Sequence, residues 1–213
     1  MGYDITYKCL GGNQYEFILT LYRDCDGIEL GATADLNFES TSCGQSFTET
    51  LDSVDVNEVS EVCPSSLNQT TCNGGNIPGT EEVIYKDTLT LPANCSDWVI
   101  SYENCCRNDN ITNLDDPNSG MYTEVSLDNT GGLCNNSPTY SSNPVPYICS
   151  GQLFTFNHGA TDPDADSLVY SLVEPLEDSS GVITSIGYSD PNFTADSALS
   201  TATNFTMDST TGT

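Results

Sequence analysis

The sequence predicts an all-β protein of two sandwich-like domains, the first of which is held together by disulfide bonds. Runs of alternating apolar and polar residues recur along the chain, and nothing before Gly132 has the period of a helix. Ten cysteines, an even number, lack the paired C-x-x-C spacing of zinc sites. Together these observations favour short strands joined by disulfides in an oxidising compartment.

A hairpin begins the first predicted domain, with strands over Ile5–Leu10 and Tyr15–Cys25 around a Gly-Gly-Asn turn. Ala34–Ser40 and Gln45–Leu51 follow as shorter strands. From Asp52 to Glu61 acidic residues interleave with valines, a pattern that suits an exposed edge or a loop better than a central strand.

The centre of this domain is predicted in the segment Cys95–Arg107, which holds three cysteines and the only tryptophan. Trp98, Ile100 and Tyr102 alternate with the residues between them, as in a strand with one buried face. Further strands are predicted on either side of this segment, at Glu82–Leu91 and Met121–Leu127.

All ten cysteines are predicted to form five intramolecular disulfides. Eight extended residues span roughly 26 Å and disulfide partners need Cα atoms within about 7 Å, so Cys95 is expected to bond a cysteine outside this segment. Because an extended chain points adjacent side chains to opposite faces, Cys105 and Cys106 are expected to bond two different neighbours. The polar loop between Cys63 and Cys72 suggests a local bridge, and the other pairings stay open. The ten residues are Cys9, Cys25, Cys43, Cys63, Cys72, Cys95, Cys105, Cys106, Cys134 and Cys149.

A second domain is predicted where the composition changes. The segment Asn135–Pro146 is polar and contains three prolines, so it is interpreted as an extended seam that divides the chain into domains 1–136 and 137–213. A strand is predicted at Leu168–Val173. This second unit is interpreted as a sandwich cut short, and Met1 is interpreted as an internal residue.

Charge limits the partners. The chain has 31 acidic and four basic residues, a net charge of -27, which disfavours nucleic acid and anionic membranes. No apolar run approaches the roughly 20 residues of a membrane span, so membrane insertion is not expected. Five glycosylation sequons favour secretion, at Asn68, Asn94, Asn110, Asn192 and Asn204.

Two parts of the chain resemble known families. Gly151–Phe156, Ala160–Leu172 and Met207–Gly212 together resemble the cadherin-like and immunoglobulin-like repeats of bacterial surface proteins. In those repeats the acidic turn usually carries glycine where this chain has Ala165, which makes a positive φ costlier there. The resemblance implies an incomplete Ig-like or cadherin-like β-sandwich in the second domain.

The first domain resembles the N-terminal region of large secreted adhesin-like proteins of gliding-type bacteria, which use type IX secretion. The motifs that carry the likeness are Ile5–Phe17, Leu21–Cys25 and Trp98–Asn108. The resemblance implies an extracellular protein at the cell surface, acting as an adhesin or a filament component.

A calcium site is predicted at Asp162, Asp164 and Asp166. Spacing by two presents three hard oxygen ligands from one turn, and Ca²⁺ takes six to eight such ligands. The resemblance to cadherin-like repeats also implies calcium. The alternative is an acidic turn without a metal ion.

Catalysis is not predicted. His158 is the only histidine and has no recognisable Ser or Cys nucleophile motif around it, which disfavours triad chemistry. Trp98 lies in the middle of a predicted strand and is assigned to the core rather than to a sugar-binding platform. Because basic residues are so few, Arg23 and Arg107 are expected to pair with carboxylates near the disulfide framework.

The sequence thus predicts a non-enzymatic extracellular module, structural or adhesive, of a bacterial surface protein or filament that calcium stiffens. Its expected partners are other protein domains, copies of itself and surface glycans. The alternatives are a carbohydrate-binding module of a secreted enzyme and a secreted hydrolase.

Overall fold

The computed structural model describes residues 2–107, 111–116, 118–132, 134–143, 148, 151–199 and 206–213. These residues form strands, loops and four short 3-10 helices, so the all-β prediction is confirmed. They divide into two compact units, and each is described by itself. The first unit includes Met1–Tyr102 and Glu124–Ser137, and the second includes Glu103–Thr123, Pro138–Ser142 and most of the chain from Tyr147 to Thr213. The division differs from a single cut after residue 136, because Glu103–Thr123 groups with the second unit.

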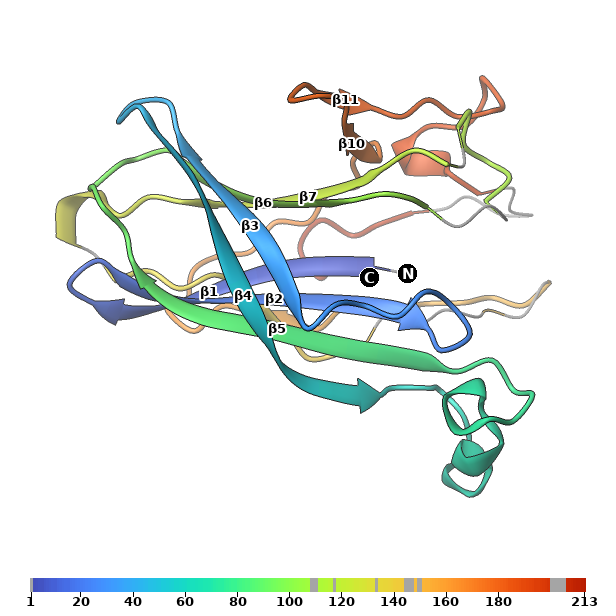
Figure 1. Cartoon of the computed structure of the whole chain (residues 1–213). Coiled ribbons are helices and arrows are strands. Elements are labelled where there is room, and N and C mark those ends of the chain that lie inside the picture. Colours follow the sequence, from blue (N-terminus) through green and yellow to red (C-terminus); the bar gives the residue numbers. More distant parts are fainter. Residues whose placement is uncertain are drawn as a thin grey trace. The chain divides into compact units, whose positions relative to one another are not determined.

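A seven-stranded sheet dominates the structure, with strand order β1-β2-β5-β4-β3-β6-β7 (Figure 1). The strand pairs from β1 through β6 in this order are antiparallel. The bounds of the strands are β1 Gly2–Gly11, β2 Gln14–Asp24, β3 Thr33–Ser40, β4 Gln45–Glu58, β5 Thr80–Thr90, β6 Trp98–Asn104 and β7 Met121–Leu127.

The predicted hairpin is confirmed in β1 and β2. Its turn is made by Gly11, Gly12 and Asn13, whose φ angles are 90°, 63° and 62°. Glycine adopts such angles without steric cost and asparagine tolerates them, which explains why the chain reverses here. The prediction for Trp98, Ile100 and Tyr102 on β6 is also confirmed, since all three are buried and the residues between them are not.

The strand β4 connects two layers of the sheet. Its first half pairs with β3 as far as Asp52, and its second half pairs with β5 from Asp52 to Glu58. An irregularity between Ser53 and Asp55 separates the two pairings. Such a bulge bends a strand, which lets one sheet fold into a sandwich-like arrangement. The expectation of an exposed edge at Asp52 is consistent with this second half, although the segment is a strand through Glu58 rather than a loop.

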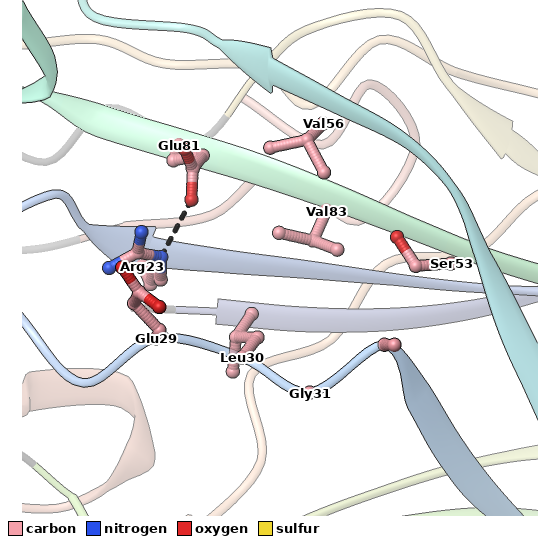
Figure 2. A pocket seen from close by; sticks show the side chains of 9 residues that line it. Arg23, Glu29, Leu30, Gly31, Ser53, Val56, Glu81 and Val83 are labelled. Carbon is pink, nitrogen blue, oxygen red and sulfur yellow. Dashed lines mark hydrogen bonds and ion pairs between the residues drawn. The ribbon is translucent and has the colours of Figure 1, made fainter.

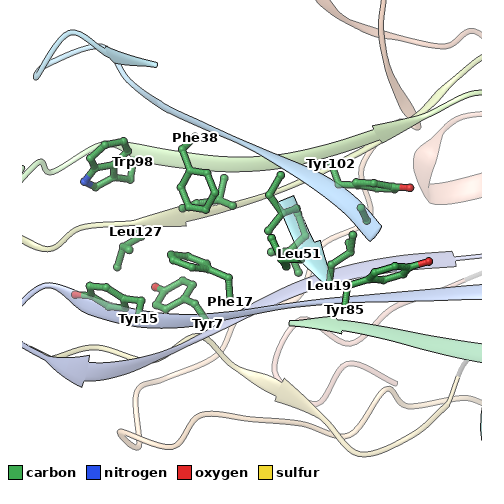
Figure 3. Close-up of a cluster of buried hydrophobic side chains, with 14 of the residues drawn as sticks. Tyr7, Tyr15, Phe17, Leu19, Phe38, Leu51, Tyr85, Trp98, Tyr102 and Leu127 are labelled. Atoms are coloured by element: carbon green, nitrogen blue, oxygen red, sulfur yellow. The ribbon is translucent and has the colours of Figure 1, made fainter. Parts of the chain in front are cut away.

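The core lies between the layers (Figure 3). Aromatic rings connect them: the ring centroids of Phe17 and Phe38 are 4.9 Å apart edge to face, and Phe38 stacks on Phe47 at the same distance. Trp98 closes this row against Phe47 and is completely buried. Such pairs add about 0.5–1.5 kcal/mol each beyond the area they bury.

Three disulfides hold the first unit. They are Cys9–Cys134, Cys25–Cys72 and Cys43–Cys95, with Cα separations of 5.4, 4.9 and 6.0 Å. Cys95 therefore bonds outside its own segment, as predicted.

Two disulfide predictions are wrong. Cys72 bonds Cys25 instead of Cys63, because the loop that carries Cys72 packs at the end of β2, where Cys25 N–H donates to the carbonyl of Gly79. Cys105 and Cys106 bond each other. They follow the last residue of β6, Asn104, so the two-face argument for an extended chain does not apply to them.

Two cysteines remain. Within the described residues Cys63 has no disulfide partner and is exposed, so its predicted place in a bridge is not confirmed. Cys149 lies outside the described residues.

The second unit contains only short strands in its described part: β8 Thr139–Tyr140 with β9 Ala160–Thr161, and β10 Leu176–Asp178 with β11 Ile183–Ser185. The strand predicted at Leu168–Val173 is not formed. Its alternating apolar residues do not face a core, since Val169 is 82% and Val173 73% exposed. Alternation produces a strand only where a second strand pairs with it.

We predict that removing the Cys43–Cys95 bridge with the double substitution Cys43→Ala/Cys95→Ala lowers the free energy of unfolding by about 2–5 kcal/mol, the usual loss for a native disulfide. Urea denaturation measures the change. The matched control is Cys63→Ala, which removes an exposed thiol and should stay within about 0.5 kcal/mol of the parent. Equal effects of the two changes would show that the bridge does not hold the first unit together.

Candidate functional site

The first unit has a pocket of about 460 Å³ at one end of the sheet, which we call the Arg23 pocket (Figure 2). One side is the connection between β2 and β3, residues Glu29–Ala32. The strands β2, β4 and β5 supply the remaining lining residues, Arg23, Ser53, Val56, Glu81 and Val83.

The pocket forms where the apolar core ends. On β2 every second residue from Tyr15 to Leu21 is buried and apolar, and Arg23 is the next position on that face. Its partner across the sheet is Glu81 of β5. The Nε atom of Arg23 donates to Oε2 of Glu81 at 2.7 Å, which confirms the prediction that Arg23 pairs with a carboxylate.

Arg23 also orders the turn that follows β2. Its Nη1 atom donates to the carbonyl oxygen of Gly27 at 3.2 Å. Two hydrogen bonds from the strands hold the Glu29–Ala32 connection. The buried Tyr85 hydroxyl donates to the carbonyl of Gly31 at 2.7 Å, and Ser53 N–H donates to that of Ala32 at 2.8 Å. Burial raises the pKa of Tyr85, and the charge of Arg23 opposes this increase; the net rise keeps the hydroxyl protonated as a donor.

The lining combines polar and apolar groups. Val83 is buried, while Val56 is 54% exposed at the rim. Glu29 is exposed and makes no hydrogen bond or ion pair with a described residue. The lining contains one hydroxyl, on Ser53, and neither histidine nor cysteine. These groups can hold a small polar molecule, but the lining offers no nucleophile next to a base.

Sequence reasoning missed this pocket, although it singled out Arg23. The signal was present in the alternation of β2, where a charged residue occupies a position on the buried face. Its partner Glu81 could not be identified, because the pairing of β2 with β5 joins residues 58 positions apart.

The other arginine of the chain, Arg107, is half-buried in the second unit. Its Nε atom donates to the carbonyl of Gly120 at 3.1 Å and its Nη2 atom to that of Leu176 at 3.0 Å. These bonds join three segments of that unit. They go to backbone carbonyls, so the carboxylate pairing predicted for Arg107 is not confirmed by them.

The acidic turn at Asp162 does not gather its carboxylates around one point. Oδ1 of Asp162 accepts the backbone N–H of Asp164 at 2.8 Å and of Asp166 at 3.2 Å, and Ala165 takes a φ of 65°. The part of the chain that the structure describes contains no group of three acidic, histidine or cysteine side chains that could surround a metal ion. The oxygen ligands suit calcium in type but are not placed to bind it together, so calcium binding stays a prediction.

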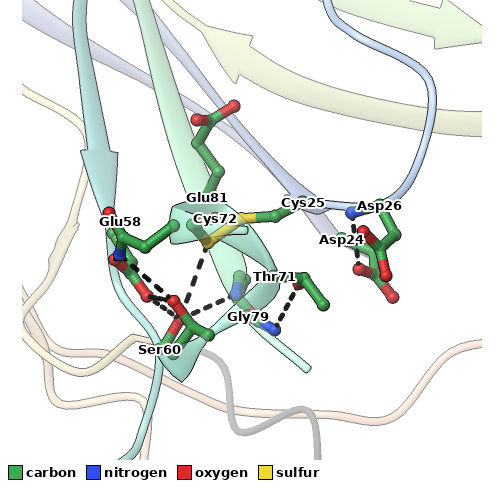
Figure 4. Close-up of a disulfide and its surroundings, with 12 residues drawn as sticks. Asp24, Cys25, Asp26, Glu58, Ser60, Thr71, Cys72, Gly79 and Glu81 are labelled. Carbon is green, nitrogen blue, oxygen red and sulfur yellow. Dashed lines mark hydrogen bonds between the residues drawn. A yellow bond between two sulfur atoms is a disulfide. The ribbon is translucent and has the colours of Figure 1, made fainter. Parts of the chain in front are cut away.

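Glu58, near the Cys25–Cys72 bridge, accepts hydrogen bonds at both carboxylate oxygens (Figure 4). Glu58 accepts hydrogen bonds from Ser60 at 2.7 Å, Thr70 at 2.6 Å and Asn73 at 2.7 Å. Burial alone would raise the pKa of Glu58, but these bonds lower it below its ordinary value. Glu58 therefore holds the loop with the 3-10 helices η1 Pro64–Gln69 and η2 Thr71–Asn73, and its oxygens are occupied.

The two remaining residues considered for function, His158 and Trp98, both pack against other side chains. The ring of His158 lies edge to face with Phe156 at 4.8 Å and with Tyr140 at 6.1 Å. Trp98 is fully buried, which confirms its assignment to the core. Among the residues described, no helix is long and apolar enough to cross a membrane.

A carboxyl group with an unusual titration lies on the other face of β1. Burial raises the pKa of Asp4 to about 6; the hydrogen bond with Thr20 opposes this rise, and the charge of Glu82 adds to it. Burial also raises the pKa of the neighbouring Tyr22, and the charges of Asp4 and Glu82 add to this rise. Asp4 is therefore partly protonated near pH 6 in the folded protein.

A scan against known protein families, a search of curated proteins and a search of solved structures each found no match to this chain. The likeness to adhesin-like proteins of gliding-type bacteria therefore rests on the sequence motifs alone.

We predict that Asp4→Asn stabilises the protein at pH 7 to 8 by about 1–3 kcal/mol, since one pKa unit corresponds to about 1.4 kcal/mol. The folded pKa of about 6 lies above the ordinary 3.8. The parent therefore loses stability as pH rises from about 4 through 6, and the variant should not. Melting temperatures across this range measure the difference. Asp52→Asn, at an exposed position, is the control, and parallel pH profiles for Asp4→Asn and the parent would refute the prediction.

The calcium prediction has a separate test. Calcium should raise the melting temperature of the protein, and Asp164→Asn should abolish this rise because it removes a carboxylate ligand. Calorimetry with CaCl₂ provides the measurement, with MgCl₂ at equal ionic strength as the control. If neither salt produces a specific effect, Asp162 is only the hydrogen-bond acceptor of an acidic turn.

Proposed function

We propose that this chain is a non-enzymatic structural or adhesive module that works outside the cell, as part of a bacterial surface protein or filament. The observation that carries the proposal is the set of three disulfides in the first unit, which join residues 125, 47 and 52 positions apart. Disulfides of this kind persist in oxidising environments and restrict the unfolded chain. They suit a module that must stay folded when exposed on a surface.

The arrangement of polar groups supports a binding role over a catalytic one. The carboxylates with several hydrogen bonds, such as Glu58, hold loops. His158 packs against aromatic rings. The Arg23 pocket offers charged and apolar contacts without a nucleophile and base in contact.

Exposed apolar side chains of the second unit support contact with other domains or with copies of the chain. Leu153, Val169 and Val173 are 93%, 82% and 73% exposed. Large apolar side chains on a surface are often covered by a partner in proteins that assemble.

A carbohydrate-binding module of a secreted enzyme is the second candidate. The Arg23 pocket favours it, because its volume lies within the about 300–1,000 Å³ of small-molecule sites. In that role the catalytic domain would belong to another part of the same protein.

The proposal is tested with the purified chain on two measurements. A panel of chromogenic glycosides, esters and peptides should show no turnover, and the fluorescently labelled chain should be retained on bacterial cells or on immobilised surface polysaccharide. Reduced and alkylated protein, which has lost the bridges, is the control for retention. Turnover that follows the protein through purification would overturn the proposal, as would equal retention of the folded and reduced forms.

A further inference from the structure

We infer that the Arg23 pocket binds a neutral saccharide, with Arg23 as the hydrogen-bond donor, Glu29 as the acceptor and Val56 as part of the apolar wall. The inference deepens the adhesive part of the proposed function and rests on it. It assigns a ligand class to a site that is otherwise only a hollow at the end of the core (Figure 2).

The donor is the second terminal nitrogen of Arg23. A guanidinium carries five N–H donors, and the bonds to Glu81 and to the turn use Nε and Nη1. Nη2 bonds no described residue. If Nη2 were buried, it would be a buried polar atom without a partner. Within the described residues, the buried side-chain nitrogens and oxygens without a partner are Trp98 Nε1 and Ser119 Oγ. Nη2 therefore reaches solvent from a guanidinium that its other bonds hold in place.

The acceptor and the wall come from other segments. Glu29 lines the same pocket on the β2–β3 connection and forms no ion pair with Arg23, so its carboxylate is available. Val56 and Val83 are opposite each other on β4 and β5 and supply an apolar surface. The bonds from Tyr85 and Ser53 fix the connection, so the site is formed before a ligand arrives.

These groups select among ligands by charge. Arg23 and Glu81 neutralise each other, Glu29 adds a negative charge, and the chain carries -27, so an anion is repelled. A cation would satisfy Glu29 but would leave the free donor of Arg23 facing a positive charge. A hydroxyl both accepts and donates, so neighbouring hydroxyls of a sugar can bond Arg23 and Glu29 together while its C–H groups contact the valines.

The openness of the pocket favours part of a glycan chain over a free amino acid. Glu29, Gly31 and Ala32 are exposed, and Val56 is half exposed. A small zwitterion needs an enclosed site to gain enough contact, whereas a glycan extends beyond the rim. No aromatic ring is among the lining residues, so we expect a dissociation constant of about 1 mM for one site. Many copies on a surface would bind a polysaccharide much more tightly.

The test is a titration of the ¹⁵N-labelled full chain, followed by amide chemical shifts. The probes are methyl glycosides of glucose, galactose and mannose, N-acetylglucosamine and their neutral disaccharides, with glucuronic acid, lysine and leucine as charged comparisons. Saturable shifts are expected for at least one neutral sugar at Gly31, Ala32, Ser53 and Val83. Glucuronic acid should leave these amides unchanged.

Two pairs of variants separate the pocket from the surface. Val56→Trp fills the pocket and should abolish the shifts, whereas Val54→Trp, at an equally exposed position of the same strand, should keep them. Glu29→Gln should weaken binding about tenfold through loss of a charged acceptor, and Glu39→Gln should not.

The inference is overturned if no neutral sugar shifts the pocket amides, if binding survives in Val56→Trp, or if only lysine or leucine binds there. Cell retention distinguishes this failure from that of the proposed function. If Val56→Trp is retained on cells like the parent and the sugars bind nowhere, the adhesive role stands without the pocket. If sugars bind but are also hydrolysed, the proposed function fails and the saccharide site remains.

Discussion

The first unit depends on the way β4 exchanges partners along its length. Its residues up to Asp52 continue the layer of β3, and the residues from Asp52 to Glu58 continue the layer of β5. The exchange of partners happens at the irregularity that begins at Ser53. There the backbone N–H of Ser53 donates to the carbonyl of Ala32, in the connection that lines the pocket. The same bend that encloses the core therefore also positions one wall of the Arg23 pocket.

The Cys43–Cys95 disulfide acts where backbone pairing stops. Cys43 lies in the turn after β3 and Cys95 precedes β6, so their bridge joins the two loops just beyond the point where the β3–β6 pairing ends, at Glu39 and Val99. Asp97 reinforces the same place by accepting bonds from Ser40 and from the backbone of Ser42, and these bonds lower the pKa of its carboxyl group. Covalent and charged contacts thus stabilise turns, while the apolar residues stabilise the layers.

The sequence predicted the features that depend on neighbours along the chain. The β1–β2 hairpin and the buried face of β6 follow from turn residues and alternation alone. Disulfide pairing depends on segments far apart in sequence, so the local pair Cys63 and Cys72 was a poor guide to a bridge with Cys25. Alternation at Leu168–Val173 was likewise insufficient to predict a strand, because a strand also needs a partner. The pocket could not be predicted without the β2–β5 register, which places Glu81 opposite Arg23.

A charged pair at the end of an apolar row requires an explanation beyond stability. Replacing a buried or partly buried ion pair by well-packed apolar residues is often neutral or stabilising, whereas removing one partner alone is costly. Leucine and valine neighbours already occupy the same face of β2 and β5, so apolar residues would fit the alternation at Arg23 and Glu81. What the pair provides instead is a guanidinium held by several hydrogen bonds at the end of the apolar row, with its Nη2 atom bonded to no described residue. A preorganised donor of this kind contributes to binding, because its orientation does not have to be fixed when the ligand arrives.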